Sequence, residues 1–259
     1  MTRSIDNRFE DFFSDDAYVA LKNHLYNYLL RRHAVRKHLQ REGEGLVLEV
    51  GTGLSPIAEA SDRVVYSELS FQAIRMLKSR QGKGCFVVTD ATRLPFKGAS
   101  FSQVIASEVL EHIPEDRLAI REIASVMKPG GSLILTFPHR RSYFSVDDRF
   151  ANHLRRYELA ELEKTLGEAG LKTTEVEKVL GPLEKITMAA CTALIPLVDR
   201  IRKARGTGGR RGGGGASKWA VSVFQGMNRL YAWPVWLDAR LTPRRLASVL
   251  LVRAVKEIR

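Results

Sequence analysis

Cysteine is scarce in this chain, and two other common signals are missing. Its 259 residues include only Cys85 and Cys191, without a C-x-x-C spacing. The sequence therefore favours neither a disulfide framework nor a cysteine zinc site, and it fits a reducing, cytoplasmic setting. No run reaches about 18 consecutive apolar residues, which argues against a bilayer-spanning helix. The opening MTRSIDNRFEDFF contains acids and no long apolar core, so we do not expect a secretion signal.

Acidic residues are nearly absent from the last part of the chain. Residues 1–199 hold 27 basic and 27 acidic residues, whereas residues 200–259 hold 14 basic and 2 acidic ones. The whole net charge of +12 therefore lies in the last 60 residues. This asymmetry is typical of a segment that meets an anionic partner, either a membrane surface or a nucleic acid. A solvated basic face would have the same composition.

Short apolar runs alternate with helical patterns along most of the chain. Residues 157–170 and two earlier segments, 70–80 and 115–128, have helical spacing, and KPGG (128–131) is expected to separate a helix from a strand. A first helix is expected to start at Asp15, after Ser14 as its cap, and to continue through Leu29. The alternation predicts an α/β fold with a doubly wound, mostly parallel sheet of seven strands. The strands are expected at residues 46–50, 63–69, 85–90, 102–107, 132–137, 171–179 and 247–255.

The composition divides the chain into four parts. We expect an N-terminal helical cap (1–45), a ligand-binding core (46–181), a helical, basic insertion between the last two strands (182–245) and a closing strand (246–259). The insertion contains an apolar stretch, a glycine tract at 206–215, and WAVSVFQGMNRLYAWPVWL (219–237), which holds all three tryptophans. Its apolar parts are expected to roof the site as a lid, to lie on an anionic membrane, or both. Long aliphatic runs between the basic residues disfavour a nucleic-acid partner.

A glycine turn follows the first strand in the segment EVGTGLSP (49–56). Gly51 and Gly53 permit a tight turn and close approach of a ligand to the backbone. Ser55 and Pro56 fit the cap and first residue of a helix, whose N-terminus would face an anion. Pro56 also occupies the third glycine position of G-x-G-x-x-G, so the dinucleotide fingerprint is incomplete. Taken alone, the pattern also fits an ordinary tight turn.

Acids occur at the ends of the next strands. Glu68 ends the second strand, 19 residues after Glu49, and could accept hydrogen bonds from both hydroxyls of a ribose. Asp90 ends the third strand and could accept from an adenine amine. SEVLEHI (107–113) follows the fourth. Because the carboxyl ends of parallel strands meet at one edge of a sheet, these acids are predicted to share a ligand site.

In order and spacing, LEVGTGLSP, YSELS, TDATRLPF, FSQVIASEVLEHI and MKPGGSLILTFP resemble the motifs of class I S-adenosylmethionine-dependent methyltransferases. The nearest group is similar to the small-molecule enzymes of quinone biosynthesis. The resemblance covers residues 46–180 and 247–256, and it departs from the family pattern at Ser55, where the family has a third glycine. It implies a Rossmann-like fold and S-adenosylmethionine as the cofactor. It also implies a cofactor site of Glu49, Gly51 and Gly53 at the methionine end, Glu68 and Leu69 at the ribose, Asp90 and Ala91 at the adenine, and Ser107 and Glu108 below the sulfonium.

Several histidines could act as a base for a hydroxyl or thiol acceptor. His112 is the best placed of them, and His139 and His153 come next, although each could equally be structural or face solvent. Glu108, Glu111 and His112 also form an E-x-x-E-H pattern. Some related methyltransferases hold a divalent ion with this pattern, and others have it without metal. No metal ligand is assigned from the sequence, and metal binding by this pattern is left open.

These observations predict a cytoplasmic methyltransferase that methylates oxygen or carbon of a small, lipophilic acceptor. Peripheral contact with the inner membrane face is one expectation for its basic insertion. The alternatives are an RNA methyltransferase that uses the basic segment, and a non-catalytic module that only binds S-adenosylmethionine. An NAD enzyme is disfavoured by Pro56. The identity of the acceptor and the oligomeric state are left open.

Overall fold

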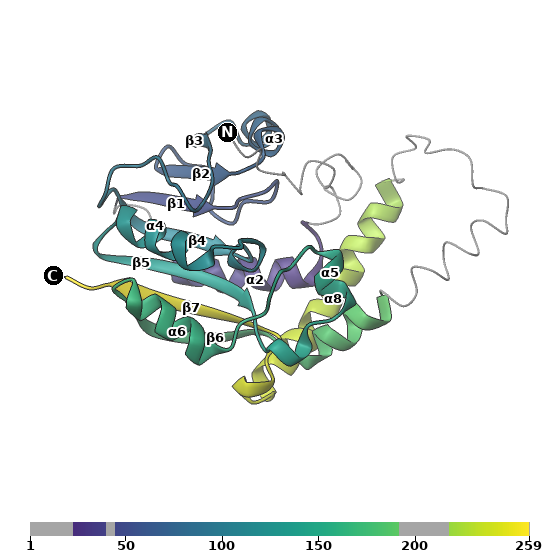
Figure 1. The fold of residues 1–259 in the computed structure, drawn as a ribbon. Helices are drawn as coiled ribbons and strands as arrows, with labels where there is room; N and C mark the ends of the chain where they lie inside the picture. The colour runs from purple at the N-terminus through teal and green to yellow at the C-terminus, as the bar shows by residue number, and fades with distance from the viewer. Residues whose placement is uncertain (1–22, 40–44, 192–217, 259) are drawn as a thin grey trace, which may run out of the picture.

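A seven-stranded sheet forms the centre of the computed structural model, which describes residues 23–39, 45–191 and 218–258 (Figure 1). The strand order is β3-β2-β1-β4-β5-β7-β6, and β7 runs antiparallel to the other six strands. This arrangement confirms the predicted doubly wound, mostly parallel α/β fold. The strands are β1 (Leu46–Val50), β2 (Val64–Glu68), β3 (Cys85–Val88), β4 (Phe101–Ser107), β5 (Met127–Pro138), β6 (Leu171–Leu180) and β7 (Val249–Lys256).

Helices cover both faces of the sheet. On one face lie α2 (Tyr26–His38), α3 (Phe71–Gln81) and α8 (Lys218–Leu241), and on the other lie α4 (Asp116–Val126) and α6 (Leu159–Glu168). A further helix covers residues 182–191. Shorter helical turns are η2 (Leu110–His112), η3 (Arg141–Tyr143), α5 (Val146–Phe150) and η4 (Arg244–Leu246).

The central strands are buried on both faces, which explains their nearly continuous apolar sequences. In β5, Leu133 and Leu135 pack into the core beneath α4 and α6, whereas Ile134 between them packs into the core beneath α2 and α8. In β7, Leu250 and Leu251 divide between the two cores in the same way. Side-chain alternation along each strand therefore builds two hydrophobic layers from one sheet.

The N-terminal helix differs from the prediction. The sequence predicts a helix from Asp15 through Leu29, but among the described residues 23–24 form a turn, Leu25 is extended and α2 begins only at Tyr26. The backbone N–H of Tyr26 donates to Oδ1 of Asn228 on α8 at 3.1 Å. A side chain distant in the sequence therefore accepts from an N–H in the first turn of α2, which has no acceptor within the helix. The expected cap at Ser14 lies outside the described residues.

The segment KPGG also behaves differently from the prediction. It lies within β5, which already starts at Met127, rather than between a helix and a strand. Met127 pairs with Phe101 and Ser132 with Gln103, so the intervening residues 128–131 bulge from the ladder. Pro129 disfavours helical geometry at Lys128. This restriction explains why α4 ends at Val126, before the predicted boundary at residue 128.

Both ends of the segment between β6 and β7 lie at the same edge of the sheet. The N–H of Ser248 donates to the carbonyl of Leu180 at 2.9 Å, and the helix at 182–191 and α8 are built outward from this junction. The predicted glycine tract at 206–215 lies outside the described residues. Among the helices that are described, none is long and apolar enough to cross a membrane.

A buried carboxylate connects the loop after β5 with these helices. Asp148 accepts two hydrogen bonds from Nε of Arg156, at 2.8 and 2.9 Å, and lies 3.3 Å from Nζ of Lys185. Nδ1 of His153 contacts Oδ1 of Asp148 at 2.8 Å, and Nη1 of Arg156 also donates to the carbonyl of Ser248 at 3.2 Å. Burial alone would raise the pKa of Asp148, but the hydrogen bonds from His153 and Arg156 hold it well below its usual range.

We expect Arg156→Met to lower the free energy of unfolding by about 3–5 kcal/mol, because it leaves the Asp148 carboxylate buried with fewer partners. The neighbouring Arg155→Met is a matched control. Arg155 pairs with Asp116 at a more exposed position, with 34% of the arginine side chain accessible against 4% for Arg156, so its loss should cost less. Urea unfolding measures the free energy of unfolding of both variants. Equal losses in the two variants would show that the buried pair of Arg156 and Asp148 stabilises the fold no more than the pair of Arg155 and Asp116.

Candidate functional site

The glycine turn after β1 has the backbone geometry that the sequence predicts. Gly51 and Gly53 have φ angles of +66° and +54°, in the left-handed region that favours glycine. A Cβ added to Gly51 would lie 2.6 Å from Cγ2 of Val109, so a side chain is excluded there. The N–H of Gly51 donates to the carbonyl of Ser67 at 2.8 Å and fixes the turn beside the end of β2.

The helix expected after this turn does not form, so the prediction for Ser55 and Pro56 is wrong. Residues 51–62 are turns and bends. Side chains instead form hydrogen bonds with backbone carbonyls of this segment. The carbonyl of Ser55 accepts from the Tyr28 hydroxyl at 3.1 Å, and the carbonyl of Ile57 accepts from Nε of Arg36 at 2.9 Å. Ligand binding here cannot rest on a helix N-terminus.

Glu49 supports this irregular segment from below. Its buried carboxylate accepts from the N–H of Ile57 at 2.8 Å and of Ala58 at 2.9 Å. Burial raises the pKa of Glu49 to about 7, against the opposing effect of the two N–H donors. Glu49 therefore shapes the turn through the backbone, and its contact with a ligand stays a prediction.

The structure brings Glu68 directly against the glycine turn. Its Oε2 accepts from the N–H of Gly53 at 2.9 Å, and its Oε1 accepts from the N–H of Leu69 at 2.8 Å. The next strand continues the same edge, because Thr89 donates from its N–H to the carbonyl of Glu68 at 3.0 Å. Asp90 follows at once, with Oδ1 accepting from both the N–H and the hydroxyl of Thr92 at 2.8 Å. Ala91, also predicted, lies between them in this turn.

The end of β4 supplies the last predicted cofactor residues. The hydroxyls of Ser107 and Thr136 lie 2.8 Å apart, across β4 and β5. Glu108 has a positive φ of 54°, and its Oε2 lies 3.4 Å from Nη1 of Arg31 on α2. Sequence analysis did not identify Arg31, and no local pattern links α2 with β4. The arginine brings a positive charge to the edge where the acids gather.

The three candidate histidines have different surroundings. His139 is buried, with Nδ1 2.9 Å from the carbonyl of Ala247, and burial lowers its pKa. His112 and His153 instead lie together, with ring centroids 4.8 Å apart. Beside them is Glu111, which is fully buried, and burial together with the nearby charge of Glu108 raises the pKa of Glu111 well above its usual range. The sequence did not predict that His153 joins this group.

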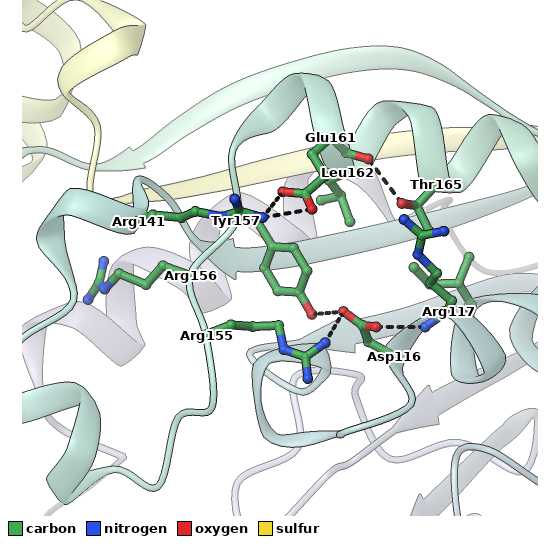
Figure 2. Close-up of a pocket in the computed structure, with 10 residues that line it drawn as sticks. Asp116, Arg117, Arg141, Arg155, Arg156, Tyr157, Glu161, Leu162 and Thr165 are labelled. Carbon is green, nitrogen blue, oxygen red and sulfur yellow. Dashed lines mark hydrogen bonds and ion pairs between the residues drawn. The ribbon is translucent and has the colours of Figure 1, made fainter.

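A separate cavity of about 390 Å³ lies between α4 and α6 and contains none of the predicted site residues (Figure 2). Its polar side chains pair with one another. Asp116 accepts from the Tyr157 hydroxyl at 2.7 Å and pairs with Arg155 at 2.8 Å, and Arg141 pairs with Glu161 at 2.6 Å. These contacts hold the segment before α6 against α4.

The glycine turn and the acids at the ends of β2 and β3 lie on a sheet whose β7 runs antiparallel to the other strands. Residues 48–135 match the methyltransferase domain family. The matched residues include β2 to β4 and most of β1 and β5, so the likeness to this family lies in the part of the chain that contains the glycine turn and the acids.

Curated relatives resemble only part of the chain. A demethylmenaquinone methyltransferase from Paenarthrobacter aurescens is 38% identical over 36% of this chain and 38% of its own length. A probable S-adenosylmethionine-dependent methyltransferase from Mycolicibacterium smegmatis is 29% identical over 60% of this chain and 62% of its own length. The chain therefore spans less than two thirds of either relative.

Solved structures show the fold over nearly the whole chain. A chain in the complex of the Haloferax volcanii Trm112 methyltransferase activator with a putative methyltransferase matches with a TM-score of 0.63 at 15% identity, over 98% of this chain and 100% of that chain. Phosphoethanolamine N-methyltransferase 2 from Haemonchus contortus, solved with S-adenosylhomocysteine, matches with a TM-score of 0.61 at 17% identity, over 99% of this chain and 61% of that one. Identities this low support the shared fold alone.

The raised pKa of Glu49 predicts a pH-dependent stability. Because its pKa is higher in the folded protein than its ordinary value of 4.5, the stabilising contribution is complete below pH 4.5 and is lost as the pH rises towards 7. The limiting slope is about 1.4 kcal/mol per pH unit. Glu49→Gln cannot titrate, so its deficit relative to the unmodified protein should shrink across this window. Urea unfolding at several pH values between 4.5 and 7 measures this deficit, and Glu59→Gln, at an exposed position, is the control. If the free energies of unfolding of Glu49→Gln and of the unmodified protein change in parallel with pH, the raised pKa of Glu49 is contradicted.

Proposed function

We propose that this chain binds S-adenosylmethionine at the edge formed by β1, β2 and β3 and transfers its methyl group to a small, lipophilic acceptor. The observation that carries the proposal is the contact of the Glu68 carboxylate with the N–H of Gly53 at 2.9 Å. It places a hydrogen-bond acceptor suited to a ribose next to a turn that has no side chains at Gly51 and Gly53. This is the arrangement that a nucleoside with an extended amino-acid tail requires.

The residues at this edge fit the parts of S-adenosylmethionine. Glu68 uses three backbone donors, the longest from Ser70 at 3.3 Å, and a carboxylate has about four acceptor positions. It therefore keeps capacity for a hydroxyl. Asp90 uses Oδ1 for Thr92, and its Oδ2 has no hydrogen-bond partner among the described residues, which suits an adenine amine.

The cofactor supplies a methyl group on a positively charged sulfur, and this chain supplies binding and alignment. Orientation of two reactants can contribute about 7–11 kcal/mol to a transfer of this kind. Ser107 and Thr136 fix the ends of β4 and β5 to each other, so the floor of the site is rigid. Relatives named demethylmenaquinone methyltransferase support a small, lipophilic acceptor.

The outer face of α8 supports contact with an anionic membrane. Large apolar residues recur along it at helical spacing and are between 40% and 77% exposed: Trp219, Val223, Met227, Leu230 and Trp233. Exposed tryptophans on an amphipathic helix are typical of the membrane interface.

The charge near this stripe fits the same partner. Arg229 precedes Trp233 by four residues and Arg240 follows it by seven, so both lie on the Trp233 side of the helix. The guanidinium of Arg240 also covers the ring of Trp236, 4.3 Å from its centroid. Each basic residue at a lipid surface adds about 1 kcal/mol of attraction to anionic headgroups. Such contact would bring a lipophilic acceptor to the same molecule.

Glu68→Ala should weaken S-adenosylmethionine binding at least tenfold, because a charge-assisted hydrogen bond of about 1.5–3 kcal/mol is lost. Isothermal calorimetry measures the affinity, and Glu168→Ala on α6 is the matched surface control. The unmodified protein should bind S-adenosylmethionine and S-adenosylhomocysteine and should not bind NAD. Affinity for NAD alone would overturn the proposal, and unchanged affinity in Glu68→Ala would remove Glu68 from the site.

Replacing both Leu230 and Trp233 by serine should reduce binding to vesicles of mixed phosphatidylcholine and phosphatidylglycerol at least tenfold. Burial of one such side chain contributes about 1.5–3 kcal/mol. Co-sedimentation measures binding, which should also weaken in high salt. Ile258→Ser, at an exposed apolar position outside α8, is the control. If the unmodified protein does not sediment with anionic vesicles at low salt, membrane contact is refuted while cofactor binding is unaffected.

A further inference from the structure

The cavity between α4 and α6 has an apolar floor (Figure 2). The floor consists of the buried lining residues Ile120, Leu162 and Tyr157, which are 1%, 1% and 5% exposed. The volume of about 390 Å³ falls in the range of about 300–1,000 Å³ that is typical of small-molecule sites. The cavity therefore has the room and the apolar base that a small organic molecule requires.

Positive charge exceeds negative charge around this floor. Four arginines and two acids line the cavity: Arg117, Arg141, Arg155, Arg156, Asp116 and Glu161. The guanidinium of Arg156 is bound to Asp148, outside the cavity, so it does not contribute to this balance. The other five charged residues form the rim of the cavity, and its three arginines exceed its two acids by one charge.

Arg117 is the arginine of the rim without a close partner. Its guanidinium makes no hydrogen bond among the described residues, and its Nη1 lies 3.7 Å from Oε2 of Glu168, beyond hydrogen-bond distance. The carboxylate of Asp116 cannot serve it, because the Tyr157 hydroxyl at 2.7 Å and Arg155 at 2.8 Å already bind there. Since a guanidinium carries five N–H donors, the rim has more donors than acceptors.

Arg141 has a partner that it can exchange. Both oxygens of Glu161 accept from the same nitrogen, Nη2 of Arg141, at 2.7 and 2.6 Å. The two side chains are 64% and 43% exposed, and an ion pair at such a position stabilises the fold little. A more highly charged acceptor in the cavity could therefore draw the guanidinium of Arg141 away from Glu161.

We propose that this cavity binds a phosphate monoester with a small apolar body. A terminal phosphate carries a charge of about −1.5 to −2 and has three acceptor oxygens at neutral pH. These oxygens match Arg117, Arg141 and Arg155, which belong to three different segments, and guanidinium groups suit phosphate geometry. A carboxylate has one charge and two oxygens, so it would engage fewer of these donors. NAD has no terminal phosphate and is not a ligand of this kind.

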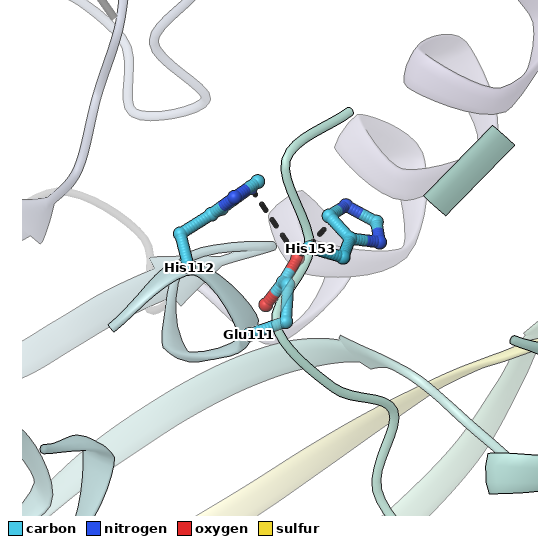
Figure 3. A group of neighbouring side chains, drawn as sticks. All are labelled: Glu111, His112 and His153. Atoms are coloured by element: carbon cyan, nitrogen blue, oxygen red, sulfur yellow. Dashed lines mark ion pairs between the residues drawn. The ribbon is translucent and has the colours of Figure 1, made fainter. Parts of the chain in front are cut away.

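A short segment of chain joins the cavity to the end of β4. His153 lies beside Glu111 (Figure 3), and the N–H of the next residue, Leu154, donates to the carbonyl of Glu111 at 2.8 Å. Arg155 then donates from Nη2 to the carbonyl of Pro114 at 3.0 Å and pairs with Asp116 at the rim. A ligand that binds Arg155 would hold this segment in place and so stabilise the fold.

The cavity contains none of the residues predicted to bind S-adenosylmethionine. The phosphate ligand and the cofactor would therefore occupy separate sites, and neither should displace the other. The inference does not depend on the proposed function, since the charges and the apolar floor that carry it belong to the cavity alone.

Isothermal calorimetry of the full-length protein with phenyl phosphate at low salt tests the site. Inorganic phosphate should bind more weakly because it leaves the apolar floor empty, and phenol should bind more weakly because it has no charge. Arg117→Gln should weaken the binding of phenyl phosphate about tenfold, since a charge-assisted hydrogen bond is lost. Arg121→Gln is the matched control, because Arg121 is exposed on α4 one turn later and does not line the cavity.

Arg141 and Glu161 allow a second test with opposite expectations. Arg141→Gln and Glu161→Gln remove the same ion pair, so they should lower the melting temperature of the free protein equally. Arg141→Gln should weaken the binding of phenyl phosphate, whereas Glu161→Gln should bind it at least as tightly as the unmodified protein does. Added phenyl phosphate should accordingly raise the melting temperature of Glu161→Gln and of the unmodified protein.

Four results would overturn the site. They are the absence of phenyl phosphate binding at low salt, equal weakening by Arg117→Gln and Arg121→Gln, equal weakening by Arg141→Gln and Glu161→Gln, and displacement of phenyl phosphate by S-adenosylmethionine. Inorganic phosphate that binds as tightly as phenyl phosphate would refute the apolar body of the ligand. Calorimetry with S-adenosylmethionine alone tests the proposed function, so either can fail without the other.

Discussion

The buried carboxylate of Asp148 holds together the part of the molecule that surrounds the end of β5. Arg156 grips it with two hydrogen bonds and reaches on to the carbonyl of Ser248 at the start of β7. Lys185 approaches it from the helix at 182–191, and His153 contacts it from the loop that carries Asp148 itself. These charges stabilise one another only as a set, since loss of one partner leaves the others buried. The segment after β5, the last strand and the helix at 182–191 are therefore positioned by one group.

Much of the sheet could be predicted from the sequence because its strands are buried on both faces. Such strands appear as short apolar runs, and the predicted run at 132–137 falls within β5. The acids Glu68 and Asp90 could be identified for a related reason. Glu68 is the last residue of β2 and Asp90 lies two residues after β3, so the parallel topology brings both acids to one edge. Local sequence and parallel topology together are sufficient to predict these strands and the shared edge of the two acids.

The features that sequence analysis missed depend on contacts between distant residues. Pro56 does not start a helix because side chains from α2 and β1 bind the backbone around it. The start of α2 depends on Asn228, from nearly the other end of the chain. The approach of His153 to Glu111 depends on the path of the loop after β5. Neither residue spacing nor helical propensity contains this information, since each contact arises from tertiary packing.

The junction between Leu180 and Ser248 closes the long segment between β6 and β7 at its base. Because β7 runs antiparallel between β5 and β6, the chain leaves and re-enters the sheet at neighbouring points. The pairing of β6 with β7 therefore depends little on the length of the segment that joins them. Each doubling of the length of a flexible loop costs only about 0.6 kcal/mol in closure entropy. The length and sequence of this segment can therefore change while the strands and the glycine turn stay the same.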